Sequence, residues 1–98
     1  MVEKGTHMTI TISIPPTLQR FSAGQAEVTM KAARLDHALA TLLALYPDLG
    51  SQAFTSEGRA RPFLRVFLND QDCTRNAEPA RSLTTGDRIT LISAFAGG

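Results

Sequence analysis

The sequence contains few of the residues that build disulfide frameworks, membrane spans or nucleic-acid sites. Its one cysteine, Cys73, excludes an internal disulfide framework and fits a reducing compartment. No apolar run approaches the roughly 20 residues that a membrane helix needs. Ten Lys and Arg nearly balance nine Asp and Glu, and no basic stripe is present to neutralise phosphates. We therefore expect a cytoplasmic protein that binds neither membranes nor nucleic acid.

The length and composition indicate a single folded domain. A chain of 98 residues has no room for a second independent core, and 43% apolar residues suit a packed interior. Residues 1–7 show no hydrophobic periodicity and end in a His-Met junction of the kind that a cloning site leaves. We interpret them as a vector-derived or disordered leader. The domain is then expected over residues 8–98, with a flexible C-terminal tail at residues 93–98.

Two stretches near the N-terminus have the period of a half-buried strand. Residues 9–14 alternate polar and apolar side chains and are nearly all β-branched, until Pro15 and Pro16 end the pattern. Residues 26–30 alternate again after a turn that contains Gly24. The sequence therefore predicts a hairpin with a long connection.

The pattern then changes to a helical one. Four leucines and a tyrosine recur at i, i+4, i+7, i+8 and i+11, which predicts an amphipathic helix over residues 35–46. Arg34 stands where a Ser or Thr cap is usual, and Pro47 ends the pattern. Residues 47–62 contain glycines, prolines and scattered apolar residues, so they are expected to form a long loop.

The last third of the domain supplies the remaining strands. Residues 63–68 are too apolar to be open on one whole face, which predicts a central strand. A turn at Asn69 and Asp70 follows, with room for a short strand near Cys73. Residues 88–92 form the last predicted strand.

This order of elements limits the fold. One helix cannot cover both faces of a four- or five-stranded sheet, and the economical packing lays it diagonally across one face of a mixed sheet. We therefore predict an α+β fold of the β-grasp (ubiquitin-like) type, with one main helix across the sheet.

The candidate catalytic and metal-binding residues do not form a recognisable set. Cys73 has His37 as its one imidazole partner outside the leader, and no spacing brings the two together, so a structural thiol is the simpler interpretation. Asp70, Asp72 and Asp87 are interpreted as turn residues that cap backbone amides. A metal site would need more ligands than one His and one Cys provide. We expect no bound metal or cofactor and no enzymatic activity of the chain's own.

The C-terminus is the unusual feature of the sequence. The chain ends in Gly97-Gly98, several residues beyond the last predicted strand. Because glycine has no Cβ, such an end can enter a narrow tunnel as extended backbone, and the α-carboxylate of Gly98 stays open to attack. The alternative interpretation is a frayed terminus without a function.

The sequence as a whole resembles the MoaD/ThiS family of ubiquitin-like sulfur carrier proteins. The resemblance rests on the β-grasp order, the segment VFLND at residues 66–70, the segment LTTGD at residues 83–87 and the terminal AGG at residues 96–98. It covers nearly the whole domain and is most specific at the terminus. The opening SIPPTL at residues 13–18 and the long loop look most like carriers of a dedicated cysteine-forming route. Carriers that serve specialised metabolites look similar, whereas thiamine carriers are shorter.

The resemblance implies a chemistry performed on the protein's own end. An E1-like adenylyltransferase would use ATP and magnesium to adenylate the carboxylate of Gly98, because a free carboxylate is a poor electrophile. Sulfur from a donor enzyme would then displace AMP and leave a C-terminal thiocarboxylate. A downstream synthase would transfer this sulfur to a small molecule such as cysteine, thiamine, molybdopterin or a specialised metabolite. The partner binds ATP and magnesium, and the carrier contributes a surface and a tail.

The resemblance also suggests which residues contact these partners. Gly97 and Ala96 match the family's terminal motif directly, whereas Phe95 and Ser93 stand where an aliphatic residue and proline are more common. Phe95 is a candidate anchor in the partner's groove, with a core position as the alternative. Side chains that the helix leaves uncovered are candidates for a docking patch, with plain core as the alternative: Phe63, Phe67 and Leu91. Three arginines are candidates for steering an acidic partner, with solvated surface as the alternative: Arg59, Arg61 and Arg65.

Three other functions remain open. The chain would be the small subunit of molybdopterin synthase if its tail sits permanently in a large catalytic subunit. It would be a protein modifier if the activated glycine forms isopeptide bonds with lysines. It would be a non-covalent interaction module if deletion of the two terminal glycines leaves partner binding unchanged.

Overall fold

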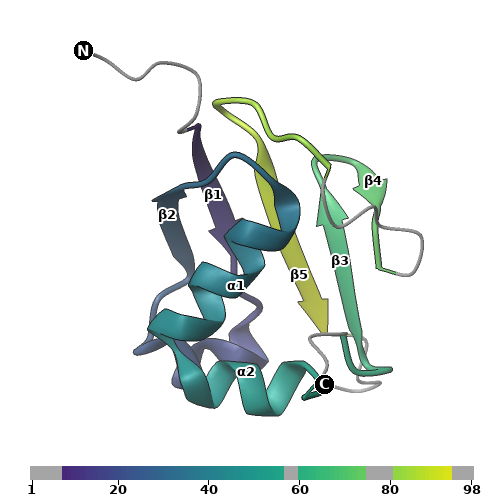
Figure 1. Ribbon diagram of the computed structural model, residues 1–98. Helices are drawn as coiled ribbons and strands as arrows, with labels where there is room; N and C mark the ends of the chain where they lie inside the picture. The colour runs from purple at the N-terminus through teal and green to yellow at the C-terminus, as the bar shows by residue number, and fades with distance from the viewer. Residues whose placement is uncertain (1–7, 57–59, 75–80, 94–98) are drawn as a thin grey trace.

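A computed structural model describes residues 8–56, 60–74 and 81–93 and shows one mixed sheet with helices on one of its faces (Figure 1). Residues 1–7, interpreted above as a leader, lie outside the described residues. The elements of the described chain are β1 (Thr9–Ser13), the 3-10 helix η1 (Pro16–Ser22), β2 (Glu27–Lys31), α1 (Leu35–Leu45), α2 (Pro47–Ala53), β3 (Leu64–Leu68), β4 (Gln71–Asp72) and β5 (Arg88–Ser93).

The strand order in the sheet is β2-β1-β5-β3-β4. β1 and β5 run parallel, and the other neighbours run antiparallel. β5 is therefore the central strand, and it joins the β1–β2 hairpin to the β3–β4 hairpin. The strand predicted at residues 63–68 begins at Leu64 and lies between β5 and β4, but β4 pairs with only two of its residues. The central position thus belongs to β5, and the short strand near Cys73 is confirmed as β4.

The helix predicted over residues 35–46 is α1, which crosses one face of the sheet (Figure 1). Its buried residues Leu35, Ala38 and Leu42 join a core made by alternate residues of the strands, such as Ile12 and Ile89, which are both 0% exposed. Burial of each such side chain contributes about 1.5–3 kcal/mol. The predicted β-grasp arrangement is therefore confirmed, with five strands in the described sheet.

The start of α1 is organised without a conventional cap. Arg34 is the N-cap residue, and its side chain makes no capping hydrogen bond. Its guanidinium instead donates to both carboxylate oxygens of Asp36, at 3.1 and 2.9 Å. These hydrogen bonds hold the pKa of Asp36 below its ordinary value. The backbone N–H of Leu35 donates to the carbonyl oxygen of Arg81 at 2.9 Å, so a distant segment satisfies one of the unpaired groups of the helix start.

The prediction of a loop over residues 47–62 is wrong in its first half, which forms α2. Pro47 occupies the first turn of α2, where its missing N–H costs nothing, and Asp48 beside it complements the helix dipole. Leu49 and Ala53, four residues apart, are both fully buried. Gly50 faces α1, where a Cβ atom would stand 3.4 Å from Leu43 Cδ2. Glycine and proline suggested a loop, yet here they start a helix and let it approach another.

No helix within residues 8–56, 60–74 and 81–93 is long and apolar enough to cross a membrane. The same residues contain no cluster of His, Cys, Asp and Glu side chains that could hold a metal ion.

Candidate functional site

The candidate site begins where β5 ends. This strand runs to Ser93, one residue further than predicted, and Ser93 is opposite Leu64 in β3. The expected tail therefore starts after Ser93. The residues predicted to carry the chemistry and its recognition lie outside the described residues: Phe95, Ala96, Gly97 and Gly98.

The strand that leads to the C-terminus is held on both sides. β5 pairs in parallel with β1 through Thr90 opposite Ser13, and antiparallel with β3 through Thr90 opposite Phe67. Ile89 and Leu91, which flank Thr90, are 0% and 2% exposed and belong to the core. Pairing on both sides up to Thr90, and with β3 alone as far as Ser93, fixes the point from which the last five residues depart. Fully extended, a segment of that length spans at most about 17 Å.

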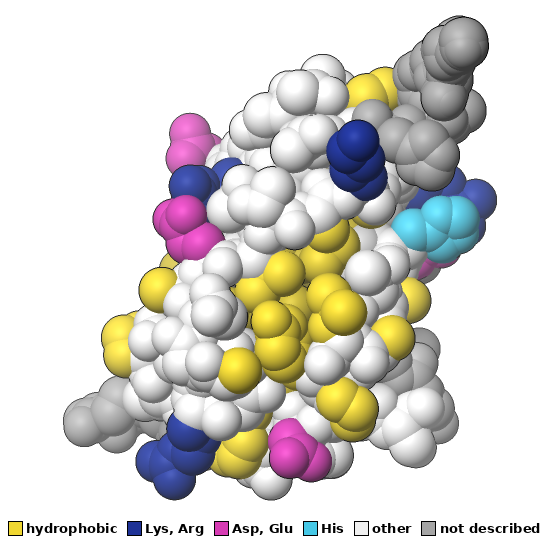
Figure 2. Space-filling model, turned by 90° about the vertical axis from the view of Figure 1, so that its left-hand side faces the viewer, with side chains coloured by type: hydrophobic (Ala, Val, Ile, Leu, Met, Phe, Trp, Pro, Cys, Tyr) yellow, Lys and Arg dark blue, Asp and Glu magenta, His cyan; other side chains and the backbone are white. Residues whose placement is uncertain are grey.

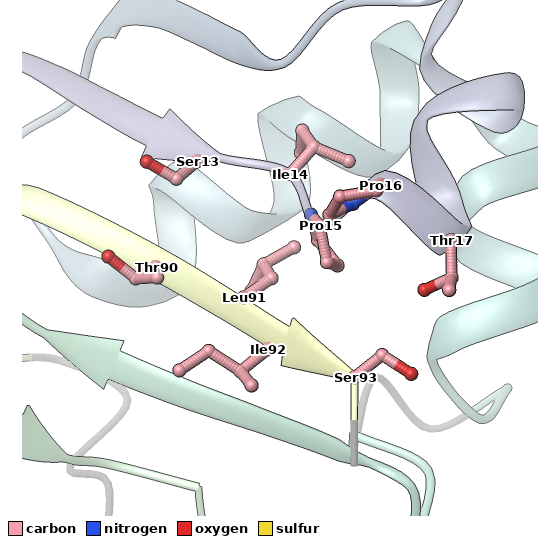
Figure 3. Close-up of a pocket in the computed structure, with 9 residues that line it drawn as sticks. All are labelled: Ser13, Ile14, Pro15, Pro16, Thr17, Thr90, Leu91, Ile92 and Ser93. Atoms are coloured by element: carbon pink, nitrogen blue, oxygen red, sulfur yellow. The ribbon is translucent and has the colours of Figure 1, made fainter. Parts of the chain in front are cut away.

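An open hollow lies beside the end of β5, and prolines cause it. The pairing between β1 and β5 stops at Ser13, because Pro15 lacks the N–H that would continue the ladder. Pro16 then begins η1, which leads the chain away from β5. A hollow of about 510 Å³ remains between the two segments. Its lining comes from residues 13–17 on one side and residues 90–93 on the other, and the Leu91 side chain extends from β5 towards Pro15 (Figure 3).

The face of the sheet opposite α1 is uncovered by any helix of the described chain (Figure 1). The strand residues that alternate with the buried ones point to this face. Most are polar, including Thr11, Ser13, Arg88 and Thr90. On β3 and β5 the apolar ones are Phe67, which is half-buried, and Ile92, which is 43% exposed.

Phe67 and Ile92 form one small apolar patch near the base of the tail. Phe67 is opposite Thr90 and Arg65 is opposite Ile92, so Phe67 and Ile92 are diagonal neighbours on the same face. Such neighbours lie about 7–8 Å apart, within reach of an aromatic side chain. Phe67, one of the residues proposed for docking, thus lies on the accessible face. Ile92, which the sequence reasoning did not single out, lies beside it. The alternation of buried Ile89 and Leu91 was the signal that could have identified Ile92.

The other two docking candidates have different surroundings. Leu91 is a core residue rather than an uncovered one, so its proposed docking role is corrected. The reason is its register, since residues 89 and 91 of β5 point to the helix-covered face. Phe63 is half-buried against the core, one residue before Leu64 and hence at the end of the sheet from which the tail departs.

Paired charges border the apolar patch. Arg88 donates to Glu27 Oε2 at 2.9 Å and also to the Ser13 hydroxyl, across three neighbouring strands. Arg65 forms an ion pair with Asp72 at 3.2 Å while its side chain stays 50% exposed. Exposed pairs of this kind contribute little to stability. The exposed guanidinium of Arg65 can therefore still contact a partner protein beside Ile92.

The remaining steering candidates are placed elsewhere. Arg61 Nη2 donates to the carbonyl oxygen of Ser51 at 3.1 Å, so it ties the segment before β3 to α2. Arg59 lies outside the described residues. Of the three arginines proposed for steering, Arg65 is therefore the one that the structure places beside the apolar patch.

The residues considered for catalysis are not brought together in the structure, and most of them make contacts that stabilise the fold. Cys73 is buried, and its Sγ accepts a contact from Arg81 Nη1 at 3.8 Å, whereas His37 is exposed on α1. Asp72 accepts the backbone N–H of Thr74 at 2.8 Å. Asp87 accepts the backbone N–H of Thr84 at 2.8 Å. The capping interpretation of Asp72 and Asp87 is therefore confirmed.

Comparison with known proteins identifies the family of this chain. The sequence matches the ThiS family over residues 13–98, a range that includes the diglycine end. The chain belongs to the ThiS family. The resemblance inferred from the β-grasp order and the terminal residues is thereby confirmed.

Several known proteins are similar to this chain over most of its length. Sulfur carrier protein CysO of Mycobacterium tuberculosis is 29% identical over 93 residues, which is 93% of this chain and 100% of CysO. Its crystal structure has a TM-score of 0.74 at 26% identity, covering 87% of this chain and 98% of CysO. The crystal structure of the BexX/CysO complex of Amycolatopsis orientalis gives a TM-score of 0.76 at 25% identity. The match covers 91% of this chain and 99% of the chain in that complex. Ubiquitin-related modifier 1 of Ajellomyces capsulatus is 30% identical over 88 residues, which is 90% of this chain and 70% of that protein.

Proposed function

We propose that this chain is a sulfur carrier protein whose reactive group is the carboxylate of Gly98. The observation that carries the proposal is the family match, which continues through the diglycine end. It is supported by the similarity to sulfur carrier protein CysO, whose whole length aligns with 93% of this chain. The described structure supports it physically, because β5 holds the base of the tail at the centre of the sheet.

In the proposed cycle, partner enzymes perform every covalent step. The oxygen of the Gly98 carboxylate attacks the α-phosphate of ATP, which releases pyrophosphate and forms an acyl-adenylate. Sulfide equivalents from a donor protein then attack the acyl carbon, AMP leaves, and the thiocarboxylate remains. ATP and magnesium belong to the activating E1-like enzyme, and a downstream synthase accepts the sulfur into a small molecule.

The carrier's own contribution is recognition. We propose that the activating enzyme docks on the uncovered sheet face around Phe67 and Ile92. The distance from Ser93 to the reaction centre is then limited by five residues, or about 17 Å. If the adenylation site of a docked enzyme lay further away than this, the Gly98 carboxylate would not reach it. The half-buried Phe63 and the hollow beside Pro15 lie at the same end of the molecule as the base of the tail.

Intact-protein mass spectrometry tests the proposal. The full chain is incubated with ATP, magnesium, a sulfur donor and each E1-like enzyme of the same genome. A mass increase equal to replacing one oxygen by sulfur, located at Gly98 by fragmentation, is the expected result. A chain that lacks Gly97 and Gly98 is the matched control and should stay unconverted. Absence of conversion with every enzyme, while an established carrier is converted in parallel, would refute the proposal.

The similarity to ubiquitin-related modifier 1 supports one second candidate, a protein modifier. In that case the activated Gly98 would form an isopeptide bond with a lysine of another protein. Immunoblots of cell lysate would then show conjugates of higher mass that disappear with the diglycine deletion. A thiocarboxylate without conjugates would leave the carrier function alone.

A further inference from the structure

The outer strand β2 exposes one side of its backbone. Among the described residues it pairs only with β1, and it forms an edge of the sheet (Figure 1). The backbone N–H of Ile14 donates to the Ala26 carbonyl at 2.8 Å, and the N–H of Ala32 donates to the Met8 carbonyl at 2.9 Å. Hydrogen-bonded positions alternate along an antiparallel pair, so the backbone N–H and C=O groups of the even-numbered residues of β2 point towards β1. The backbone groups of the odd-numbered residues point outwards.

These outward-pointing residues are Glu27, Thr29 and Lys31, with a neutral residue between opposite charges. No proline or bulge interrupts β2, although natural edges are often protected in this way. We propose that β2 pairs antiparallel with β2 of a second copy of this chain, with Thr29 at the two-fold axis. This proposal concerns the edge of the sheet and is independent of the chemistry at the tail.

The proposed register satisfies both the backbone and the charges. With Thr29 opposite its own copy, Glu27 of each chain is opposite Lys31 of the other. All these residues have outward-pointing N–H and C=O groups, so each pair can exchange both of its hydrogen bonds. The side chains lie on the same face, where opposite charges directly across a ladder stabilise the pairing.

The same charges disfavour other arrangements. A parallel β2 pair in register would place Glu27 beside Glu27 and Lys31 beside Lys31, and like charges in such positions are destabilising. A shift by two residues in the antiparallel pair removes one of the backbone pairings and separates the charges. The antiparallel register centred on Thr29 is thus the one in which the edge is complementary to itself, as a two-fold interface requires.

Glu27 can take part while keeping its intrachain partner. Arg88 occupies Oε2 of the Glu27 carboxylate at 2.9 Å, and the side chains of the pair are 45% and 57% exposed. A carboxylate has a second oxygen for Lys31 of the other copy. Each seam would then carry an Arg88–Glu27–Lys31 arrangement of alternating charge.

Apolar surface beside the edge adds a second favourable contribution. Figure 2 shows hydrophobic side chains gathered in the middle of the face that carries β2 and one side of α1. The half-buried apolar residues of these two elements are Met30, Leu39 and Leu43. In a sheet continued across the two-fold axis, both α1 helices lie on the same side of the sheet. The apolar surfaces of the two copies would then meet above the seam and exclude water.

Charge exchange at the edge tests the proposal on the full chain. Sedimentation velocity over a concentration series should show a monomer–dimer equilibrium for the wild-type chain. Glu27→Lys alone and Lys31→Glu alone each convert both cross-strand pairs to like charges, which should raise the dimer dissociation constant about tenfold or more. The double variant, or an equimolar mixture of the two single variants, should restore most of the lost affinity, but not all of it, because a lysine at position 27 stands beside Arg88 of its own chain. Asp70→Lys, an equal charge change in the exposed β3–β4 turn, is the control and should leave dimerisation unchanged.

Hydrogen exchange provides the independent readout. The amides of Glu27, Thr29 and Lys31 should become protected as the dimer forms, while those of Val28 and Met30 are protected in both states. A wild-type chain that stays monomeric at every concentration would overturn the proposal. So would a dimer that the charge variants do not weaken, or one whose formation leaves the three amides unprotected. Protection of these amides by an extended segment of another protein, in a monomeric chain, would assign the edge to that partner instead.

Discussion

Truncation of Ile92 to alanine should weaken recognition by the activating enzyme without changing the reaction at Gly98. Complete burial of an isoleucine side chain is worth about 1.5–3 kcal/mol. Ile92 still exposes 43% of its area, so covering the remainder on docking would contribute about 1 kcal/mol. That free energy corresponds to roughly a three- to tenfold change in affinity.

The chain offers a matched control for this experiment. Leu45 is the other large exposed hydrophobic residue of the described chain, at 55%, and it lies on α1 rather than on the uncovered sheet face. Leu45→Ala removes a comparable amount of exposed apolar surface from a place that the proposed docking does not use. Thermal unfolding of both variants establishes that each is folded at the assay temperature.

The assay is the initial rate of thiocarboxylate formation as a function of carrier concentration. Ile92→Ala should raise the KM for the carrier roughly three- to tenfold while kcat changes little, because the tail and its carboxylate are intact. Leu45→Ala should leave both parameters near those of the wild type. An unchanged KM for Ile92→Ala, or an equal rise for Leu45→Ala, would refute the assignment of the docking surface to the uncovered face.

Four further predictions concern the stability of the fold and the ion pair at the start of α1. Leu42→Ala empties a fully buried position under α1 and should lower the free energy of unfolding by about 2–5 kcal/mol, measured by urea denaturation. Gly50→Ala should raise it by about 0.5–1 kcal/mol, because the new Cβ stands in ordinary contact 3.4 Å from Leu43 Cδ2 and alanine favours the helix. Gly86→Ala should instead lower it by about 1 kcal/mol or more, because Gly86 has φ +97°, and equal signs for these two glycine variants would contradict the backbone argument. NMR titration of Asp36 should give a pKa below the ordinary value of about 3.9, returning towards it in Arg34→Ala; since the folded-state pKa is lowered, this contribution to stability is present above the unfolded-state pKa and is lost as the pH falls through the folded-state value.

The strands and the main helix could be predicted because their periods are regular. β1 alternates without interruption, and the residues that place α1 against the sheet recur at helical spacing. α2 was not predicted, since seven residues are too few to show a period and Pro47 and Gly50 are usually taken as breakers. Its helical state comes from tertiary burial of Leu49 and Ala53, which a local pattern does not contain.

The candidate site divides in the same way. The terminal glycines are recognisable from sequence, because the chemistry proposed for them depends on the absence of a side chain rather than on a fold. The docking surface depends on register, and a shift of one residue along a strand moves a side chain to the opposite face. Leu91 and Ile92 are adjacent and similar in size, and for this reason one is buried in the core and the other is exposed on the uncovered face. The sequence reasoning named Leu91 as uncovered, whereas the structure buries Leu91 and exposes Ile92.

Two prolines connect these observations to the tail. A longer β1 would continue its pairing along β5 and cover the side of the strand that now borders the open hollow. Pro15 stops that pairing after Ser13, and Pro16 starts η1, so the last residues of β5 keep β3 as their neighbour on one side only. The end of the central strand is thereby firmly anchored to the sheet and still open on the side towards Pro15. A carrier that must present its C-terminus to more than one enzyme needs both properties at the same point of the chain.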